Sequence, residues 1–194
     1  MLSQEDISFY LSVFRELSLG DILGLARLSK TRKLKAGDIF IDKGSTSQKL
    51  GYIKSGLIRA YHLKPNGDEL TLMLRWENQF IASIDGVIYQ RPNRFIYQAL
   101  EDTVVMEVDY QKAQQVIDKS LKLSATRHTF LLHMLGQAMD RVEGFVLLTA
   151  EERYRKLIAE KPDIYNRVPD KYLATLLGIT PVSLSRIRKR IAKA

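Results

Sequence analysis

Hydrophobic and polar positions change their spacing twice along the chain, which divides it into three zones. In residues 1–29 the apolar positions recur at helical spacing. They are Leu11, Phe14, Leu17, Ile22, Leu25 and Leu28. Ser18 followed by Asp21 is a typical capping signal for a second helical segment. The first zone therefore predicts N-terminal helices.

Residues 30 to 110 contain short runs of β-branched and aromatic residues separated by turns with glycine. The turns read KAGD at 35–38, DKGS at 42–45, KSG at 54–56 and PNGD at 65–68. Asn66–Gly67 stands between two strand-like runs and predicts a hairpin with a type I′ turn, which needs positive φ at both central residues. Regularly spaced strands of this kind indicate a small antiparallel barrel or roll.

From about residue 111 the spacing is helical again, with apolar positions in steps of 4, 3, 4 and 3 residues. These positions are Leu131, Leu135, Ala138, Val142 and Phe145. Such a stripe fits either a helix packed on its own domain or a helix paired with its copy in a homodimer. We predict that the five residues form a dimer interface, and Pro162 ends the helix that follows.

The C-terminal stretch LATLLGITPVSLSRIRKRIAKA, residues 173–194, predicts two helices joined by a tight bend. The first spans about 170–177, and Gly178 can adopt the left-handed conformation that ends it. Thr180 is a suitable N-cap residue, and Pro181 suits the first helical position because it has no N–H.

The second of these helices has one apolar and one cationic face. Leu184, Ile187 and Ile191 predict the buried stripe, whereas Ser183, Arg186, Arg190 and Lys193 share the opposite face. A short-polar and arginine-rich face is one that a DNA major groove accepts. The helix-turn-helix pattern therefore predicts a set of DNA-contacting residues, with Arg186 first among them. The set is Thr180, Ser183, Ser185, Arg186, Arg188, Lys189 and Arg190.

The net charge of +8 is concentrated in the same region. Residues 149–194 carry 11 Lys and Arg against 5 Asp and Glu, whereas residues 1–148 carry 19 against 17. A concentrated basic segment indicates a polyanionic partner, with nucleic acid before a membrane surface.

The sequence lacks the residues that several other classes of function require. The chain has no cysteine, which excludes disulfides and cysteine-held iron–sulfur clusters and fits a cytoplasmic location. The spacing of His62, His128 and His133 disfavours a metal or haem site. No phosphate-binding loop or hydrolase motif is present, so we do not expect an enzyme. We expect neither a signal peptide nor a membrane span.

With these motifs in hand, the chain resembles the Crp/Fnr superfamily of transcription regulators, most closely its short Bacteroidetes-type members. The resemblance rests on two stretches of the sequence, GDIFIDKGSTSQKLGYIKSGLIRAYHLKPNGDELTL and LATLLGITPVSLSRIRKRI. The resemblance implies an α+β fold with a jelly-roll-like, cyclic-nucleotide-binding-type antiparallel β-roll and N-terminal helices at 1–110, a dimerisation helix at 111–148, and a winged helix-turn-helix at 149–194. It also implies a homodimer that binds double-stranded DNA, with RNA polymerase as a further partner.

The chain departs from the nucleotide-binding members of that family. Where they carry Gly-Glu and then Arg-Ser or Arg-Thr, this chain reads Phe80-Ile81-Ala82-Ser83 and Pro92-Asn93-Arg94-Phe95. Cyclic AMP is therefore not the expected effector. For another small effector, the resemblance predicts a pocket between the roll and the long helix. Its predicted residues are Ser83, Asn93, Arg94, Tyr97, Ala138 and Met139.

One alternative function stays open at this point. The chain could be a ligand-binding or protein-interaction module whose basic C-terminal tail contacts an acidic partner or a membrane surface. That function needs only a basic amphipathic helix, whereas DNA reading also needs the glycine turn and the buried apolar stripe.

Overall fold

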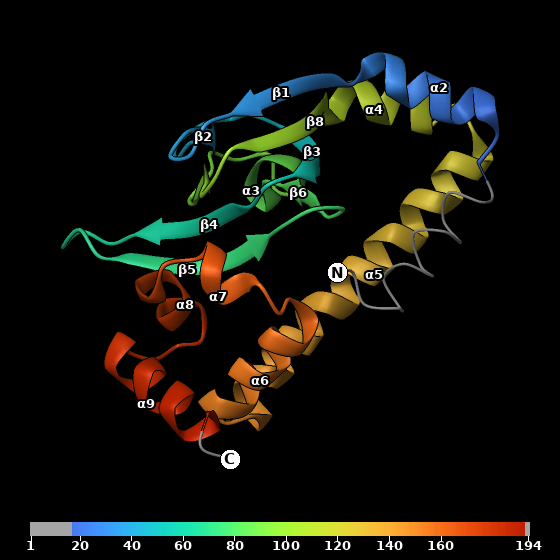
Figure 1. Cartoon of the computed structure of the whole chain (residues 1–194). Coiled ribbons are helices and arrows are strands. Elements are labelled where there is room, and N and C mark those ends of the chain that lie inside the picture. The colour runs from blue at the N-terminus through green and yellow to red at the C-terminus, as the bar shows by residue number, and fades with distance from the viewer. Residues whose placement is uncertain (1–16, 193–194) are drawn as a thin grey trace.

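The structure is a computed structural model that describes residues 17–192 (Figure 1). It opens with helix α2 (Leu19–Leu28), whose start is fixed as the sequence predicts. The backbone N–H of Asp21 donates to Ser18 Oγ at 3.1 Å, and the N–H of Ser18 donates to the Asp21 carboxylate at 3.1 Å. Leu11 and Phe14, assigned to the first helical zone, lie outside the described residues.

Eight strands form two antiparallel four-stranded sheets, as the alternation of strand and turn signals predicts. The first sheet has the order β1 (Lys30–Leu34), β8 (Thr103–Asp109), β3 (Lys49–Ser55), β6 (Phe80–Ala82). The second has the order β2 (Ile39–Ile41), β7 (Ile96–Ala99), β4 (Ile58–Leu63), β5 (Glu69–Arg75). Apart from the β4–β5 hairpin, consecutive strands fall in different sheets, so the chain forms an antiparallel β-roll. Its core contains Leu34, Phe40, Ile41, Ile53, Ile58, Ala60, Ile81, Tyr97, Ala99 and Val105.

The hairpin between β4 and β5 is present, but the predicted type I′ turn is wrong. Gly67 has φ +86°, whereas Asn66 is not among the residues with positive φ. The N–H of Gly67 donates to the Lys64 carbonyl at 3.0 Å, and the N–H of Lys64 donates to the Asp68 carbonyl at 2.9 Å. Because the Asn66 side chain bonds to Asp68, it stabilises a longer loop in which only the glycine is left-handed.

Helices carry the chain out of the roll. A short helix, α3 (Ile84–Val87), follows β6, and α4 (Tyr110–Ile117) follows β8. The long α5 (Leu121–Leu147) starts at Ser120, whose side chain accepts from the N–H of Leu123. The segment predicted as one dimerisation helix at 111–148 therefore contains two helices separated by a short break.

Four further helices follow α5: α6 (Ala150–Glu160), α7 (Ile164–Arg167), α8 (Asp170–Leu176) and α9 (Pro181–Ile191). A capping box at Thr149 and Glu152 starts α6 directly after α5 ends. No strand follows β8 within residues 110–192, so the described C-terminal region is helical and a wing stays a prediction. Among the described helices, none has the length and hydropathy to cross a bilayer.

Candidate nucleic-acid interface

The bend between α8 and α9 has the geometry that the sequence predicts. Gly178 has φ +71°, and the N–H of Ile179 donates to the Ala174 carbonyl at 2.9 Å, which closes the end of α8. Thr180 caps α9 by accepting from the N–H of Ser183 at 3.2 Å, and Pro181 occupies the first turn. Asp170 begins α8, where its negative charge faces the positive end of the helix dipole.

The apolar face of α9 is buried, also as predicted. Leu184 is 0% exposed and Ile187 is 5% exposed, while Ile191 packs at the edge of the same cluster. Ala174 of α8 is fully buried beside them, and its small side chain lets two helices approach closely. The two helices therefore form one packed unit.

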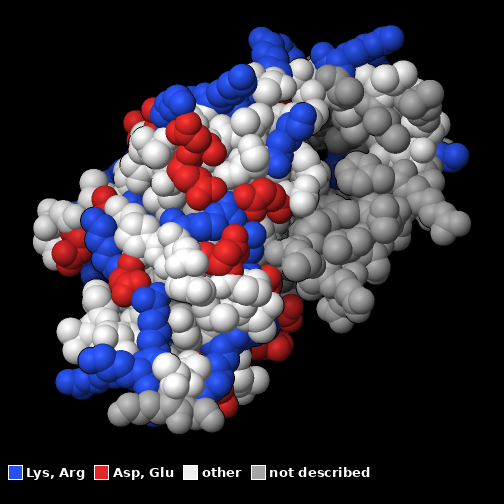
Figure 2. Space-filling model, in the orientation of Figure 1, with Lys and Arg blue, Asp and Glu red and all other residues white. Residues whose placement is uncertain are grey.

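The opposite face of α9 is exposed and cationic. Ser185, Arg186 and Lys189 are exposed. Among residues 17–192, no carboxylate forms an ion pair with Arg186 or Lys189. Figure 2 shows Lys and Arg side chains gathered at the lower left of the molecule, where Figure 1 places α9. Two cations on this face are thus available to an external anion.

Two other arginines of the predicted set already have partners. Arg188 is partly buried, and its guanidinium donates to the Tyr154 hydroxyl at 3.1 Å and to the Asp170 carboxylate at 2.7 Å. Arg190 is more exposed but pairs with Glu151 at 2.7 Å. Arg188 thus joins α9 to α6 and α8, which is a structural role that the charge pattern did not reveal. Lys193 lies outside the described residues.

Arg153 is a further structural residue that sequence reasoning missed. Its guanidinium donates to the carbonyls of Gly144 at 3.5 Å and Leu148 at 2.5 Å, where α5 ends, and to that of Leu177 at 2.9 Å, where α8 ends. A cation at two helix C-termini satisfies carbonyls that have no helical partner. No local sequence signal identifies such a residue, because its partners lie on distant helices.

The predicted dimer stripe on α5 is exposed along its length. The exposed fractions are 47% for Leu131, 59% for Leu135, 56% for Val142 and 44% for Phe145, and Ala138 is exposed as well. The apolar surface is wider than the five predicted residues. It also includes Leu132, Met139, Val146 and Leu147. Phe145 also contacts Gly178 in the turn after α8, whereas about half of each side chain is exposed at Leu131, Leu135 and Val142. This exposed apolar surface favours the homodimer interpretation.

Five of the six predicted effector residues fall into three groups. Ser83 and Tyr97 are both buried inside the roll, and burial raises the pKa of the Tyr97 hydroxyl to about 12 while a hydrogen bond with Ser83 offsets part of the rise. Asn93 is buried at a separate loop, where its side chain donates to the Ser45 carbonyl at 2.6 Å. Ala138 and Met139 are exposed on α5.

Arg94, the remaining predicted effector residue, is engaged by a carboxylate that sequence reasoning missed. Asp85 on α3 is 2% exposed, and its oxygens accept from Arg94 Nε at 3.1 Å and from Arg91 Nε at 2.9 Å. Burial raises the pKa of Asp85, but hydrogen bonds from Arg94 and Arg91 lower it by more, so that the pKa lies below its ordinary value. One ionised carboxylate therefore already pairs with both arginines that would attract an anion, and it offsets one of their two positive charges.

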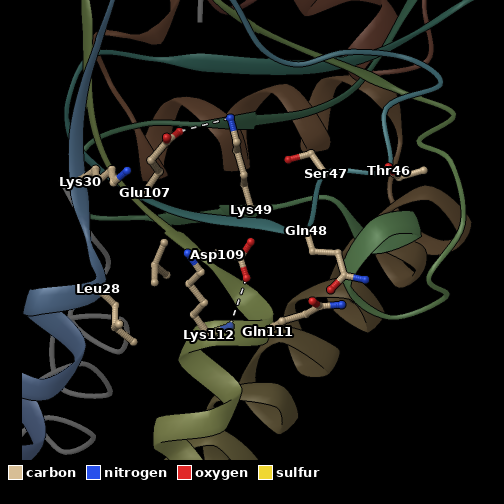
Figure 3. A pocket seen from close by; sticks show the side chains of 11 residues that line it. Leu28, Lys30, Thr46, Ser47, Gln48, Lys49, Glu107, Asp109, Gln111 and Lys112 are labelled. Carbon is tan, nitrogen blue, oxygen red and sulfur yellow. Dashed lines mark hydrogen bonds and ion pairs between the residues drawn. The ribbon is translucent and has the colours of Figure 1, made fainter.

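A cavity of about 570 Å³ lies beside residues 46–49, next to the junction of β8 and α4 (Figure 3). It is lined by Leu28, Lys30, Thr46, Ser47, Gln48, Lys49, Glu107, Val108, Asp109, Gln111 and Lys112. Lys49 Nζ lies 3.6 Å from the Glu107 carboxylate across it. The predicted effector residues do not line this cavity.

The comparisons with known proteins agree with this architecture. Residues 31–120 match the family described as the cyclic nucleotide-binding domain. The chain is 23% identical over 181 residues to electron transport regulator A of Shewanella oneidensis, covering 86% of this chain and 70% of that protein. These matches cover the roll and extend into the helical region.

The chain therefore contains a domain of the cyclic nucleotide-binding family at residues 31–120.

Two solved structures of similar fold span most of this chain. FixK2 from Bradyrhizobium japonicum superposes with a TM-score of 0.74 at 14% identity, covering 85% of each chain. The c-di-GMP responsive global regulator CLP of Xanthomonas campestris has a TM-score of 0.68 at 18% identity, covering 91% of this chain and 92% of the other. Crp/Fnr regulators are not enzymes. The resemblance to short Bacteroidetes-type members stays a prediction.

Proposed function

We propose that this chain is a sequence-specific DNA-binding transcriptional regulator of the Crp/Fnr type that acts as a homodimer. The observation that carries the proposal is the two-faced α9: Leu184 and Ile187 are buried, while Arg186 and Lys189 are exposed with no carboxylate partner in residues 17–192. Serines beside these cations let the helix approach a groove closely, and arginine suits guanine edges and phosphates.

The homodimer follows from α5. Its apolar stripe needs a partner with a similar stripe, and a second copy of the same helix supplies one by two-fold symmetry. Two α9 helices would then lie about one helical turn of DNA apart, on a near-palindromic site. A winged form of the C-terminal domain and a contact with RNA polymerase belong to the same proposal.

The interactions of Asp85 bear on the effector. Because this buried carboxylate already accepts from both Arg91 and Arg94, a cyclic phosphate would compete with it for these side chains. This supports a roll that does not respond to cyclic AMP. A different effector, if it controls α5, must bind one dimer arrangement better than another, because equal affinity shifts nothing.

The alternative, an interaction module with a basic tail, explains less of the geometry. A tail that only contacts an acidic partner needs neither the left-handed Gly178 nor the Thr180 cap. DNA reading needs both, because they fix the angle at which α9 leaves α8.

The test is a titration of double-stranded DNA at several salt concentrations, with the wild type and a Arg186→Ala/Lys189→Ala variant. The log of the wild-type affinity should fall linearly with the log of salt, and the variant should have a shallower slope, because it releases fewer counterions. A Lys43→Ala/Lys156→Ala variant removes the same charge from exposed sites elsewhere and should keep the wild-type slope. Equal slopes for both variants would contradict the proposal.

A further inference from the structure

The C-terminal helical region shares its hydrophobic core with the β-roll. Leu57, Leu74 and Trp76 come from the roll, yet they are buried in one cluster with side chains of α6 to α9. The C-terminal members are Tyr154, Ile164, Val168, Leu173, Ala174, Leu176, Leu177, Leu184 and Ile187. The helices that carry the proposed DNA interface are therefore packed on the roll as well as joined to it by α5 (Figure 1).

Hydrogen bonds complete the contact along the exposed edge of the second sheet. β5 is an edge strand, so its outer backbone groups have no strand partner. Thr175 of α8 covers that edge: its Oγ1 accepts from the N–H of Thr71 at 3.1 Å and donates to Thr71 Oγ1 at 3.1 Å. A helix thus takes the place of a neighbouring strand.

The centre of the contact is Arg59 of β4, which is 0% exposed. Its guanidinium carbon lies 3.9 Å from the ring centroid of Tyr61 and 3.5 Å from that of Tyr172 on α8. Nη2 donates to Glu69 at 2.7 Å and to Gln98 at 3.0 Å. Nε and Nη1 have no hydrogen-bond partner among the described residues, so the two rings supply much of what holds this cation.

A second set of charged residues joins the C-terminal helices to the roll. Arg167 of α7 donates to Glu77 Oε2 at 3.1 Å and to Glu101 Oε2 at 3.2 Å, and both carboxylates belong to the roll. Lys161 also lies 3.5 Å from Glu77. Arg59 and Arg167 therefore form two separate charged contacts between the roll and the helices.

We propose that Arg59 is a positioning residue for α9: through Tyr172 it holds the helix-turn-helix in one orientation on the roll, and this orientation is the one that binds DNA. The proposal rests on the proposed function. The docked arrangement leaves Arg186 and Lys189 exposed, so docking does not hide the DNA-contacting face. A helix-turn-helix that is held in place loses less conformational freedom when it binds DNA. The contact between Arg59 and Tyr172 therefore raises the affinity for DNA.

The test uses the absence of cysteine in the chain, because spin labels then attach only to introduced positions. Lys43→Cys on the roll and Lys156→Cys on α6 are exposed sites outside the contact. Doubly labelled chains are diluted with unlabelled protein, and pulsed electron paramagnetic resonance then measures the distance between the label on the roll and the label on α6. We expect one narrow distance distribution for the wild type, with the same mean after DNA is added.

Two variants break the contact from either side. Tyr172→Leu removes the ring over Arg59 and keeps an apolar side chain, and Arg59→Met removes the buried cation. Both should broaden the distribution and weaken DNA binding about three- to tenfold, the range expected from loss of one cation–π contact. Tyr172→Phe keeps the ring and should keep both the narrow distribution and the affinity. If Arg59→Met lowers the folded fraction of the protein, the two variants Tyr172→Leu and Tyr172→Phe still give the comparison.

A broad wild-type distribution, or an unchanged narrow one in Tyr172→Leu, would overturn the positioning role whether or not DNA binds. Equal or tighter DNA binding by Tyr172→Leu would also overturn it, since the contact would then be neutral or inhibitory. Failure of the wild type to bind DNA would instead refute the proposed function, and the distance distributions would still decide whether Arg59 holds the roll and the C-terminal helices together.

Discussion

The ring of Phe145, near the end of α5, packs against Gly178 in the turn between α8 and α9. A Cβ atom at position 178 would lie 3.0 Å from Cε1 of Phe145. The guanidinium of Arg153 lies 4.7 Å from the centroid of the same ring and donates to the Leu177 carbonyl beside it. The end of the long helix therefore contacts the turn that sets the direction of α9.

Gly178→Ala tests this contact. The left-handed φ costs a residue with a Cβ about 1–2 kcal/mol, and the collision with Phe145 adds to that cost. We expect the free energy of unfolding, measured with urea, to fall by about 2 kcal/mol or more. Gly67→Ala is the matched control, because Gly67 has φ +86° and no atom within 4 Å of the added Cβ. Equal losses for the two variants would show that Phe145 contributes nothing.

Arg186→Ala tests the proposed DNA contact. If Arg186 reads a base edge, the variant should lose about 1–3 kcal/mol of binding free energy at its own site and discriminate less at one base position. Affinity for sites altered at each base pair, measured by fluorescence anisotropy, gives the result. An affinity equal to that of the wild type removes Arg186 from the interface.

Arg188→Ala should act on stability. This side chain donates to Tyr154 and Asp170 in a partly buried position, so its loss leaves both groups without that partner. Bonds of charged groups contribute about 1.5–3 kcal/mol, and we expect a decrease of that order in the free energy of unfolding. Arg155→Ala removes a more exposed pair with Glu151 and should cost less than about 0.5 kcal/mol. A stable Arg188→Ala protein that binds DNA poorly would instead favour a direct contact.

The ion cluster around Glu77 predicts a dependence of stability on pH. Burial raises the pKa of Glu77, but hydrogen bonds and charge from Arg167 and Lys161 lower it to about 2, from an ordinary value of 4.5. The ionised carboxylate therefore stabilises the fold above about pH 4.5, and this contribution is lost as pH falls toward 2.

Unfolding curves of the wild type and of Glu77→Gln between pH 7 and pH 2.5 measure that contribution. The wild type should be the more stable protein at pH 7, and the difference should shrink steadily below pH 4.5. A difference that stays constant over this range would show that Glu77 titrates alike in the folded and unfolded chain.

Val142→Glu tests the homodimer. A charge within the exposed α5 stripe should convert dimers to monomers in sedimentation, because an unpaired buried charge strongly disfavours association. Leu23→Glu introduces the same charge at an exposed apolar residue of α2 and should leave the dimer intact. A monomeric wild type would contradict the interpretation of the stripe.

Local sequence signals predicted the parts of the molecule that depend on neighbours along the chain. The left-handed Gly178, the cap at Thr180 and the buried Leu184–Ile187 face each follow from a few adjacent residues, and the structure confirms them. The type I′ turn failed because the Asn66 side chain bonds to Asp68, a contact that a dipeptide rule does not consider.

Long-range partnerships were not predictable in this way. Arg188 carries the same charge as Arg186, and only the packing of α6 and α8 around it gives it a structural role. The partners of Asp85 are close in sequence, since Arg91 and Arg94 follow it by 6 and 9 positions, but no local pattern shows that its carboxylate is buried. The contact of Arg59 with Tyr172 joins residues more than a hundred positions apart.

The central claim, that a dimer reads a specific DNA sequence, is tested most directly by sequencing the DNA that the purified protein retains from a random pool at rising salt. We predict an enriched near-palindrome whose half-sites lie about one helical turn apart. The protein should retain this DNA at salt concentrations that remove non-specific DNA. Retention that depends on salt but enriches no motif would contradict it, and would leave a basic surface that binds polyanions without reading them.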